Sequence, residues 1–170
     1  AFGLTAGDFI AIFDVDHTPH PDFLDKTLGF FSDPEIGFVQ AMVTFSNHGE
    51  SLISRASAET ALDFYNITAV GKDGCGAASL IGSNAVIRRR ALEETGLYKP
   101  GLAEDLETSL SLHAGGWRSA YVREPLAPGL SPSDLLGFWK QQLKWSSGVF
   151  EAALGSLGGT FARLTRHQQF

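Results

Sequence analysis

Short apolar runs of strand length alternate along the chain with longer segments in which apolar residues recur every three or four positions. The runs cover residues 9–13, 36–45, 85–87 and 119–122. They are bounded by polar or charged residues, and the first ends directly at a carboxylate. Such runs are typical of strands buried in a sheet.

The segments between these runs predict helices. After Pro21, Phe23, Leu24, Leu28 and Phe31 recur at helical spacing. Further helices are expected over residues 52–70, 88–95 and 104–113, and from a capping segment at 131–134 to about residue 154. A glycine-rich loop is expected over residues 71–76. Strands that alternate with helices indicate an α/β sandwich with a largely parallel sheet.

The composition is that of one globular domain. The chain has 170 residues, of which 44% are hydrophobic and 19% charged. An excess of acidic residues gives a net charge of −6, which argues against nucleic acid as a partner. Cys75 is the only cysteine, so an internal disulfide is excluded and a packing role is expected. No apolar run approaches the ~20 residues that span a bilayer.

Two carboxylates, Asp14 and Asp16, follow the first apolar run. Residues two apart on an extended segment point the same way, and ligands of α/β sheets bind beyond the carboxyl ends of strands. Mg²⁺ or Mn²⁺ that also bridges phosphate oxygens would suit this pair. Acid pairs are also common in turns, so this motif alone supports a metal-binding or catalytic role and a purely structural role about equally. His17 beside the pair could equally be structural.

Two chemistries fit the carboxylate pair. The segment 13–18 resembles the first motif of haloacid dehalogenase-like phosphatases, with Asp14 as nucleophile and Asp16 as general acid/base. That motif usually has glycine at the position of His17, and it requires a second acidic pair after a strand. Glu104 and Asp105 follow a loop instead. The second chemistry is sugar transfer from a sugar nucleotide, with a metal held on the diphosphate.

Three acids, Glu104, Asp105 and Glu107, lie in the first turn of an expected helix. Acids at this position stabilise a helix through its dipole, which is a sufficient structural explanation. The functional alternative is a general base that removes a proton from an acceptor hydroxyl.

The segment 138–145 places an amide, a cation and an indole on one helical face. Gln141, Lys144 and Trp145 stand at i, i+3 and i+4. A sugar ring could stack on Trp145 while Lys144 meets a diphosphate. An amphipathic packing helix would explain the same pattern.

Taken together, four stretches in order resemble the processive family-2 glycosyltransferases of the bacterial cellulose synthase type. Residues 13–24 resemble the metal motif of that family and the helix after it. Residues 82–89 resemble its acceptor-side loop and following strand. Residues 103–105 are similar to its Thr-Glu-Asp motif, and residues 141–145 to its Gln-x-x-Arg-Trp motif. The resemblance spans about residues 7–151.

The resemblance implies an inverting, metal-dependent transfer from a UDP-sugar to a growing β-linked polysaccharide. Asp105 would be the catalytic base, and Asp14 and Asp16 would hold Mg²⁺ or Mn²⁺. The substrates would be bound by residues of all four motifs: Asp14, Gly82, Ser83, Glu104, Gln141, Lys144 and Trp145.

The resemblance also implies an organisation. Residues 1–130 would be the C-terminal half of a GT-A-type catalytic domain that lacks its N-terminal half. Residues 131–170 would form an amphipathic helix and a segment at a membrane interface. The remaining partner would be the rest of a membrane-embedded synthase, with catalysis on the cytoplasmic side of the inner membrane. Residues 1–4 would end a helix of a longer protein, and the truncated domain is expected to self-associate.

Three departures from the family pattern bear on activity. Ala103 replaces threonine in the base motif. Lys144 replaces arginine and loses its planar two-pronged donor. Residues 79–81 read Ser-Leu-Ile where the family has Phe-Phe-Cys, so acceptor specificity is expected to differ.

Overall fold

The computed structural model describes residues 5–155 and 157–169. Its centre is a four-stranded sheet in the order β1-β3-β2-β4. The strands are β1 (Phe9–Ile12), β2 (Ile36–Ala41), β3 (Ala85–Arg88) and β4 (Arg118–Val122). All four expected strands are present, although the second ends at Ala41 rather than near residue 45.

The expectation of a largely parallel sheet was wrong. β3 lies between β1 and β2 and is antiparallel to both, and only the β2–β4 pair is parallel. An apolar run specifies burial and not direction, so the sequence pattern could not reveal the reversal of β3. The reversal brings Ala85, at the start of β3, opposite both Ile12 and Gln40 at the ends of β1 and β2.

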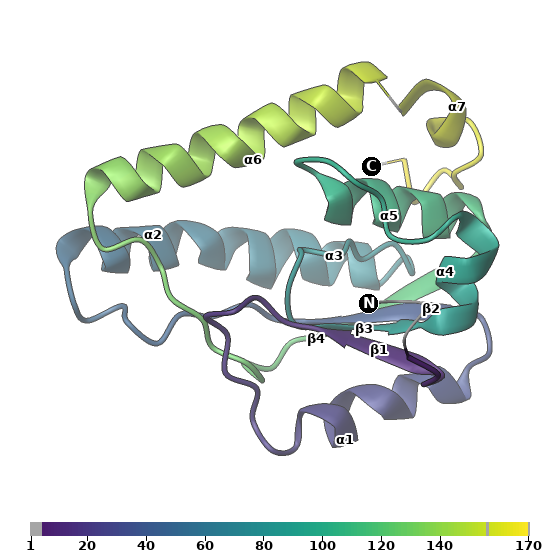
Figure 1. Cartoon of the computed structure of the whole chain (residues 1–170), viewed down its shortest axis with the longest axis horizontal. Helices are drawn as coiled ribbons and strands as arrows, with labels where there is room; N and C mark the ends of the chain where they lie inside the picture. The colour runs from purple at the N-terminus through teal and green to yellow at the C-terminus, as the bar shows by residue number, and fades with distance from the viewer. Residues whose placement is uncertain (1–4, 156, 170) are drawn as a thin grey trace.

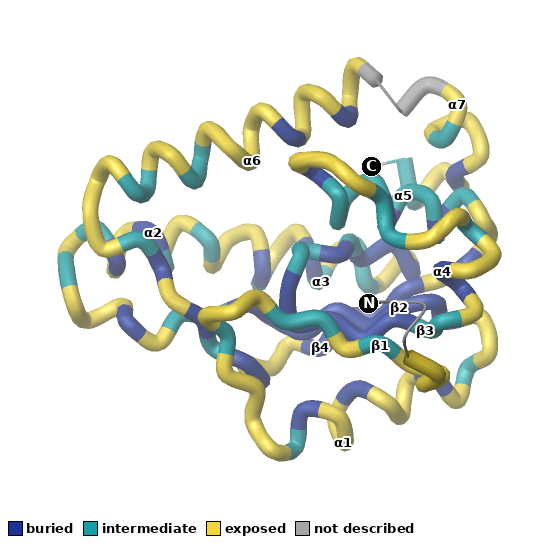
Figure 2. The backbone as a smooth tube through the Cα atoms, in the orientation of Figure 1, coloured by how far each residue is buried: buried dark blue, intermediate teal, exposed yellow. Residues whose placement is uncertain are grey.

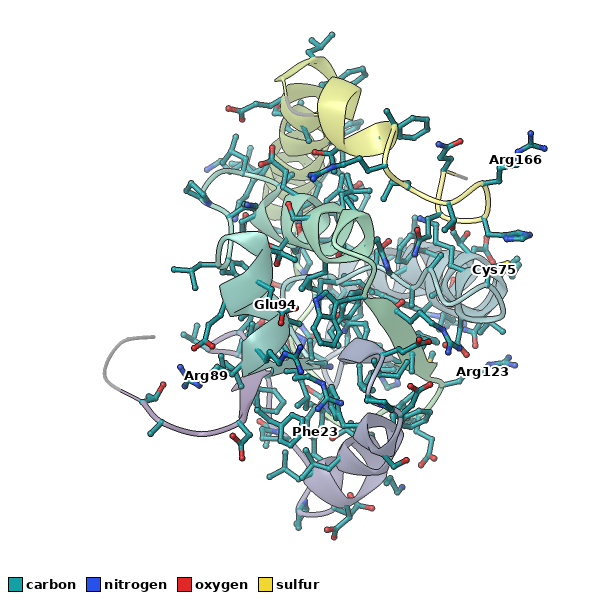
Figure 3. The ribbon with its side chains drawn as sticks, turned by 90° about the vertical axis from the view of Figure 1, so that its right-hand side faces the viewer. Phe23, Cys75, Arg89, Glu94, Arg123 and Arg166 are labelled. Carbon is teal, nitrogen blue, oxygen red and sulfur yellow. The ribbon has the colours of Figure 1, made fainter. Side chains whose placement is uncertain are left out.

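The helices follow the predicted segments closely. They are α1 (Phe23–Leu28), α2 (Leu52–Asp63), α3 (Ala69–Asp73), α4 (Arg89–Thr95), α5 (Glu104–Ala114), α6 (Leu135–Gly155) and α7 (Leu157–Phe161), with a 3-10 turn at Gly29–Ser32 and a π turn at Phe64–Thr68. The loop expected over residues 71–76 was partly wrong, because α3 continues to Asp73. Cys75 is exposed rather than packed (Figure 3).

Helices cover both faces of the sheet (Figure 1). Successive side chains of β2 point to opposite faces, with Val39 packed among the residues under α1 and Phe38 among those under α4 and α5. In the rotated view, Glu94 of α4 is drawn above Phe23 of α1 (Figure 3). Burial is concentrated in β2, β3 and β4, whereas α6 crosses above α2 as an outer, largely exposed helix (Figure 2).

Arg88 joins the end of β3 to the loop after α1. Its guanidinium donates to the carbonyl oxygens of Phe31, Asp33 and Ile36 at 2.9–3.1 Å. It also lies 5.5 Å and 5.2 Å from the ring centres of Phe9 and Phe31. The side chain of Arg88 therefore ties the segment between α1 and β2 to the end of β3.

We expect Arg88→Ala to lower the free energy of unfolding by about 2–4 kcal/mol, because a hydrogen bond from a charged donor contributes about 1.5–3 kcal/mol and water replaces part of the loss. Urea denaturation monitored by circular dichroism measures the change. Arg55→Ala is the matched control, since Arg55 forms an ion pair with Glu59 on the exposed surface of α2. Equal unfolding midpoints for the two variants would contradict this role of Arg88.

Candidate active site

The turn after β1 holds the carboxylate pair. The His17 N–H donates to the Asp14 carbonyl oxygen at 3.0 Å, and this bond closes the turn. Asp14 and Asp16 are exposed, and their carboxylates lie with the His17 ring so that one ligand atom from each is within 4.8 Å of the others. Two carboxylate oxygens and an imidazole nitrogen are a donor set suited to Mn²⁺ or Mg²⁺, so the residues fit a divalent metal.

His17 is held by the segment after β4. Its ring packs over Gly129, where a Cβ would come within 2.5 Å of the ring, so no other residue fits without displacing it. Nδ1 lies 3.3 Å from an oxygen of Asp16. The other oxygen of Asp16 accepts from the Leu130 N–H at 3.3 Å. The side chain of His17 is 6% exposed, and its Nε2 has no hydrogen-bond partner among the described residues.

From the sequence the role of His17 was open, and its position directly after Asp16 was the only signal. The fold shows that its ring lies beside the carboxylates, while the N–H of the next residue, Thr18, donates to the Pro128 carbonyl oxygen at 3.0 Å.

Asp105 lies half-buried at the start of α5, and burial raises its pKa. Its Oδ1 accepts from the Leu106 N–H at 2.7 Å, which lowers the pKa, while Glu104 and Asp14 raise it. A Cβ at Gly82 would lie 3.5 Å from Oδ2 of Asp105, so the expected acceptor-side loop is in contact distance of this carboxylate.

Asp14 shares the same electrostatic environment. Burial raises its pKa, His17 lowers it, Asp16 raises it, Lys144 lowers it and Glu104 raises it. Charges from the β1 turn, α5 and α6 therefore act on one carboxylate. Glu104 and Lys144 thus lie close enough to act on Asp14, and Glu104 and Asp14 close enough to act on Asp105. The roles that the motifs assign to these residues stay predictions.

Ser83 lies between these groups, but its hydroxyl is fully engaged. It is 2% exposed, and its Oγ accepts from the Asp14 N–H at 3.0 Å and donates to Asn84 Oδ1 at 3.0 Å. The geometry assigns this side chain to holding the backbone of Asp14. The resemblance implies that Ser83 contacts the substrate. Because the hydroxyl is engaged, we expect any such contact to be made by the backbone of Ser83, and this stays a prediction.

Gly148 places α6 against the loop that precedes Asp105. A Cβ at this position would be 2.8 Å from the Leu102 carbonyl oxygen, so glycine is required for the close approach. Lys144 stands one turn before Gly148, and Gln141 one turn before Lys144, on the same helical face. Trp145 is 48% exposed, which leaves its indole available for a ligand.

Tyr98 is a further residue of this region that the motifs did not indicate. Like Ile10 and Ile12 of β1, it packs against the buried cluster that contains Phe38 and Ile87. Burial raises the pKa of Tyr98, and so do Asp105, Glu104 and Asp14. The phenol therefore stays protonated beside the carboxylates. Its place in a loop without periodicity gave no sequence signal.

Solved structures share this fold. The mannosyltransferase PcManGT from Pyrobaculum calidifontis, in complex with GDP-Man and Mn²⁺, matches with a TM-score of 0.66 at 20% identity, over 99% of this chain and 46% of that one. Glucosyl-3-phosphoglycerate synthase from Mycobacterium tuberculosis, in complex with Mn²⁺, UDP-glucose and phosphoglyceric acid, matches with a TM-score of 0.51 at 21% identity, over 86% of this chain and 51% of that one. The α/β fold is that of GT-A glycosyltransferases, over about half of their chains.

Residues 9–169 match the family model described as glycosyl transferase family group 2, and the chain belongs to this family. Among its relatives is cellulose synthase 1 of Komagataeibacter xylinus, which is 35% identical over 158 residues, 89% of this chain and 10% of that protein. The UDP-forming cellulose synthase catalytic subunit of Xanthomonas axonopodis pv. citri is 35% identical over 160 residues, 87% of this chain and 21% of that protein.

The chain thus spans between a tenth and about a fifth of the length of these curated relatives. Within residues 5–155 and 157–169, no helix combines the length and apolar character that crossing a membrane requires.

We expect the chain to bind Mn²⁺, and Asp16→Asn and His17→Ala each to weaken binding by at least about tenfold, the lower end of the loss seen even for supporting contacts of metal ligands. Titration monitored by the electron paramagnetic resonance signal of free Mn²⁺ gives the affinities. Asp25→Asn is the matched control, because Asp25 is an exposed carboxylate of α1. Equal affinities for all variants would place Mn²⁺ elsewhere.

We also expect Asp105→Asn to raise the thermal unfolding midpoint at pH 7. Burial raises the pKa of Asp105 in the folded state, so ionisation costs stability above that pKa and nothing below both pKa values. The gain should therefore shrink as the pH falls toward 4. Differential scanning calorimetry at pH 4 and 7 measures it, and a gain that is independent of pH would contradict the assignment.

Proposed function

We propose that this chain is the part of an inverting, metal-dependent glycosyltransferase that carries the metal site and the catalytic base, and that the whole enzyme extends a β-linked polysaccharide from a UDP-sugar. The observation that carries the proposal is the meeting of charges from three elements. Asp14 lies in the turn after β1, Asp105 at the start of α5 and Lys144 on α6. Lys144 and Glu104 act on the carboxylate of Asp14, and Asp14 acts on that of Asp105.

The proposed reaction begins with the acceptor hydroxyl. Asp105 takes its proton, the hydroxyl oxygen attacks the anomeric carbon, and the bond to the diphosphate breaks with inversion. Burial raises the pKa of Asp105, and a raised pKa makes its carboxylate a stronger base toward the proton of the acceptor hydroxyl. Glu104 and Gly82 flank this carboxylate and would bind the acceptor there.

The departing diphosphate accumulates negative charge, which the opposite side of the site would stabilise. Asp14, Asp16 and His17 would hold Mg²⁺ or Mn²⁺, which supplies positive charge to the diphosphate when bound. Lys144 adds a cation from α6 but, unlike arginine, presents a point charge rather than two fixed donors. Gln141 and Trp145 would complete the wall, with the exposed indole as a stacking surface for a sugar.

The proposal extends to parts of the enzyme beyond this chain. The UDP-forming relatives are several times longer, so donor binding would need residues outside it. Residues 1–130 would then belong to a catalytic domain and residues 131–170 to an amphipathic segment. Along α6 large apolar side chains are exposed: Leu135, Leu136, Trp139, Leu143, Val149, Phe150 and Leu154. They would rest on the cytoplasmic side of the inner membrane.

Membership of the family favours sugar transfer over the phosphatase alternative. A chain that binds sugar or a partner without catalysis remains the second candidate, because Ala103 and Lys144 depart from the family motifs.

Transfer from UDP-glucose and other UDP-sugars should be measured in membranes that contain the full-length product of the gene. We expect Asp105→Asn to lower kcat by about 10²–10⁴, the usual contribution of a general base. Glu107→Gln is the matched control, since it removes a carboxylate from the same turn of α5, and its activity should stay close to that of the wild type.

The isolated 170-residue chain should show no turnover. Sugar transfer by that chain alone would contradict the need for residues outside it. Absence of transfer by the full-length product with every UDP-sugar would favour the non-catalytic candidate. Hydrolysis of a phosphate ester that is lost in Asp14→Asn would favour the phosphatase.

A further inference from the structure

The loop from Leu80 to Asn84 separates the two candidate carboxylates. At Gly82 it faces Oδ2 of Asp105, and at Ser83 it binds the backbone N–H of Asp14. None of these five residues belongs to a helix or a strand. The distance between the metal site and the base therefore depends on the conformation of this loop.

Gln40, on β2, holds this loop from beneath. Its side chain is 0% exposed. Oε1 accepts from the Ile81 N–H at 3.0 Å, and Nε2 donates to the carbonyl oxygens of Ser83 at 2.7 Å and Asn84 at 3.2 Å. Nε2 also donates to the carbonyl oxygen of Ala41 at 2.8 Å. Only an amide offers an acceptor and donors at this length, so no other side chain would satisfy the same set.

Two further buried side chains extend the contacts to either side. Asn84, at φ +56°, donates to the Ala127 carbonyl oxygen at 2.7 Å and receives the Ser83 hydroxyl on Oδ1. On the other side, the Leu80 N–H donates to Ser109 Oγ at 2.6 Å, and this hydroxyl donates to the Asp105 carbonyl oxygen at 2.9 Å. These hydrogen bonds, together with the covalent backbone of the loop, connect the backbone N–H of Asp14 to the backbone carbonyl of Asp105.

We propose that Gln40 is a positioning residue, which fixes the loop 80–84 and thereby sets the placement of Asp14 relative to Asp105. It touches neither carboxylate. The inference rests on the proposed function for its catalytic consequence, because the spacing of metal-bound diphosphate and base would decide how well the acceptor is aligned. Its structural consequence, the coupling of Gln40 to the backbone of Asp14, does not depend on sugar transfer.

The test uses Gln40→Met, which keeps the length of the side chain and removes its hydrogen bonds. In the 170-residue chain, amide hydrogen exchange by NMR should show at least about tenfold faster exchange of the Ile81 N–H, and also of the Asp14 N–H, which Gln40 does not contact. Mn²⁺ affinity should fall by about tenfold, the lower end of the effect of supporting contacts. In the full-length protein kcat should fall by about 10²-fold, the cost of a misplacement near 1 Å, with little change in the donor KM.

Thr27→Val is the matched control, because Thr27 is also 0% exposed and hydrogen-bonded but lies on α1, away from the loop. It should lower stability without changing Asp14 exchange, Mn²⁺ affinity or kcat. If Gln40→Met does not fold, Gln40→Glu replaces it, because Glu keeps the acceptor and loses the donors. Ser83→Ala should reproduce the change at Asp14 and leave Ile81 protected.

The outcomes separate the two proposals. Faster exchange at Ile81 with unchanged exchange at Asp14 and unchanged Mn²⁺ affinity would overturn the positioning role. If both change while the wild-type protein transfers no sugar, the positioning role stands and the proposed function fails. A fall in kcat equal to that of Thr27→Val at matched stability would reduce Gln40 to a structural residue and overturn the inference.

Discussion

The site depends on the antiparallel placement of β3 between β1 and β2. Because β3 runs against both neighbours, its first residue, Ala85, pairs with Ile12 and Gln40 at the carboxyl ends of those strands. The loop before β3 therefore meets the turn after β1, where Asp14 lies. If β3 were parallel to its neighbours, the loop before it would lie at the amino ends of β1 and β2. It could not then contact the turn after β1.

Gathering carboxylates at this edge has an electrostatic cost that the chain does not relieve by itself. The pKa values of Asp14 and Asp105 are both raised, first by burial and then by neighbouring acids. Lys144 and His17 oppose this effect at Asp14. The chain already carries a net charge of −6. A bound cation would therefore stabilise the ionised carboxylates, whereas an anion bound without a cation would destabilise them. A divalent metal that accompanies an anionic diphosphate satisfies both conditions.

The sequence predicted the elements and the motifs better than their arrangement. Apolar periodicity and capping signals located all four strands and the main helices, because the pattern of burial and the local backbone preference depend on residues that are close in sequence. The direction of β3 was not predictable, since it follows from how the long segment between β2 and β3 returns over the sheet. Tyr98 and Gln40 were also missed, because each acts through neighbours that are distant in sequence.

Gly148 shows why even a recognised motif could not be placed from sequence alone. The spacing of Gln141, Lys144 and Trp145 predicted a shared helical face, but not what that face meets. The answer lies in a residue outside the motif, whose missing side chain lets α6 approach the loop before Asp105.

Exposure divides the site into two kinds of residue. Asp14, Asp16 and Trp145 are exposed, whereas Gln40, Ser83, Asn84 and Ser109 are at most 2% exposed. Buried polar groups are costly unless every donor and acceptor is matched, and a matched set permits few alternative conformations. The exposed carboxylate of Asp14 therefore keeps side-chain freedom to receive a ligand, while Ser83 holds the backbone N–H of Asp14 in place. This division explains how an open surface can present charges from separate elements in one fixed arrangement.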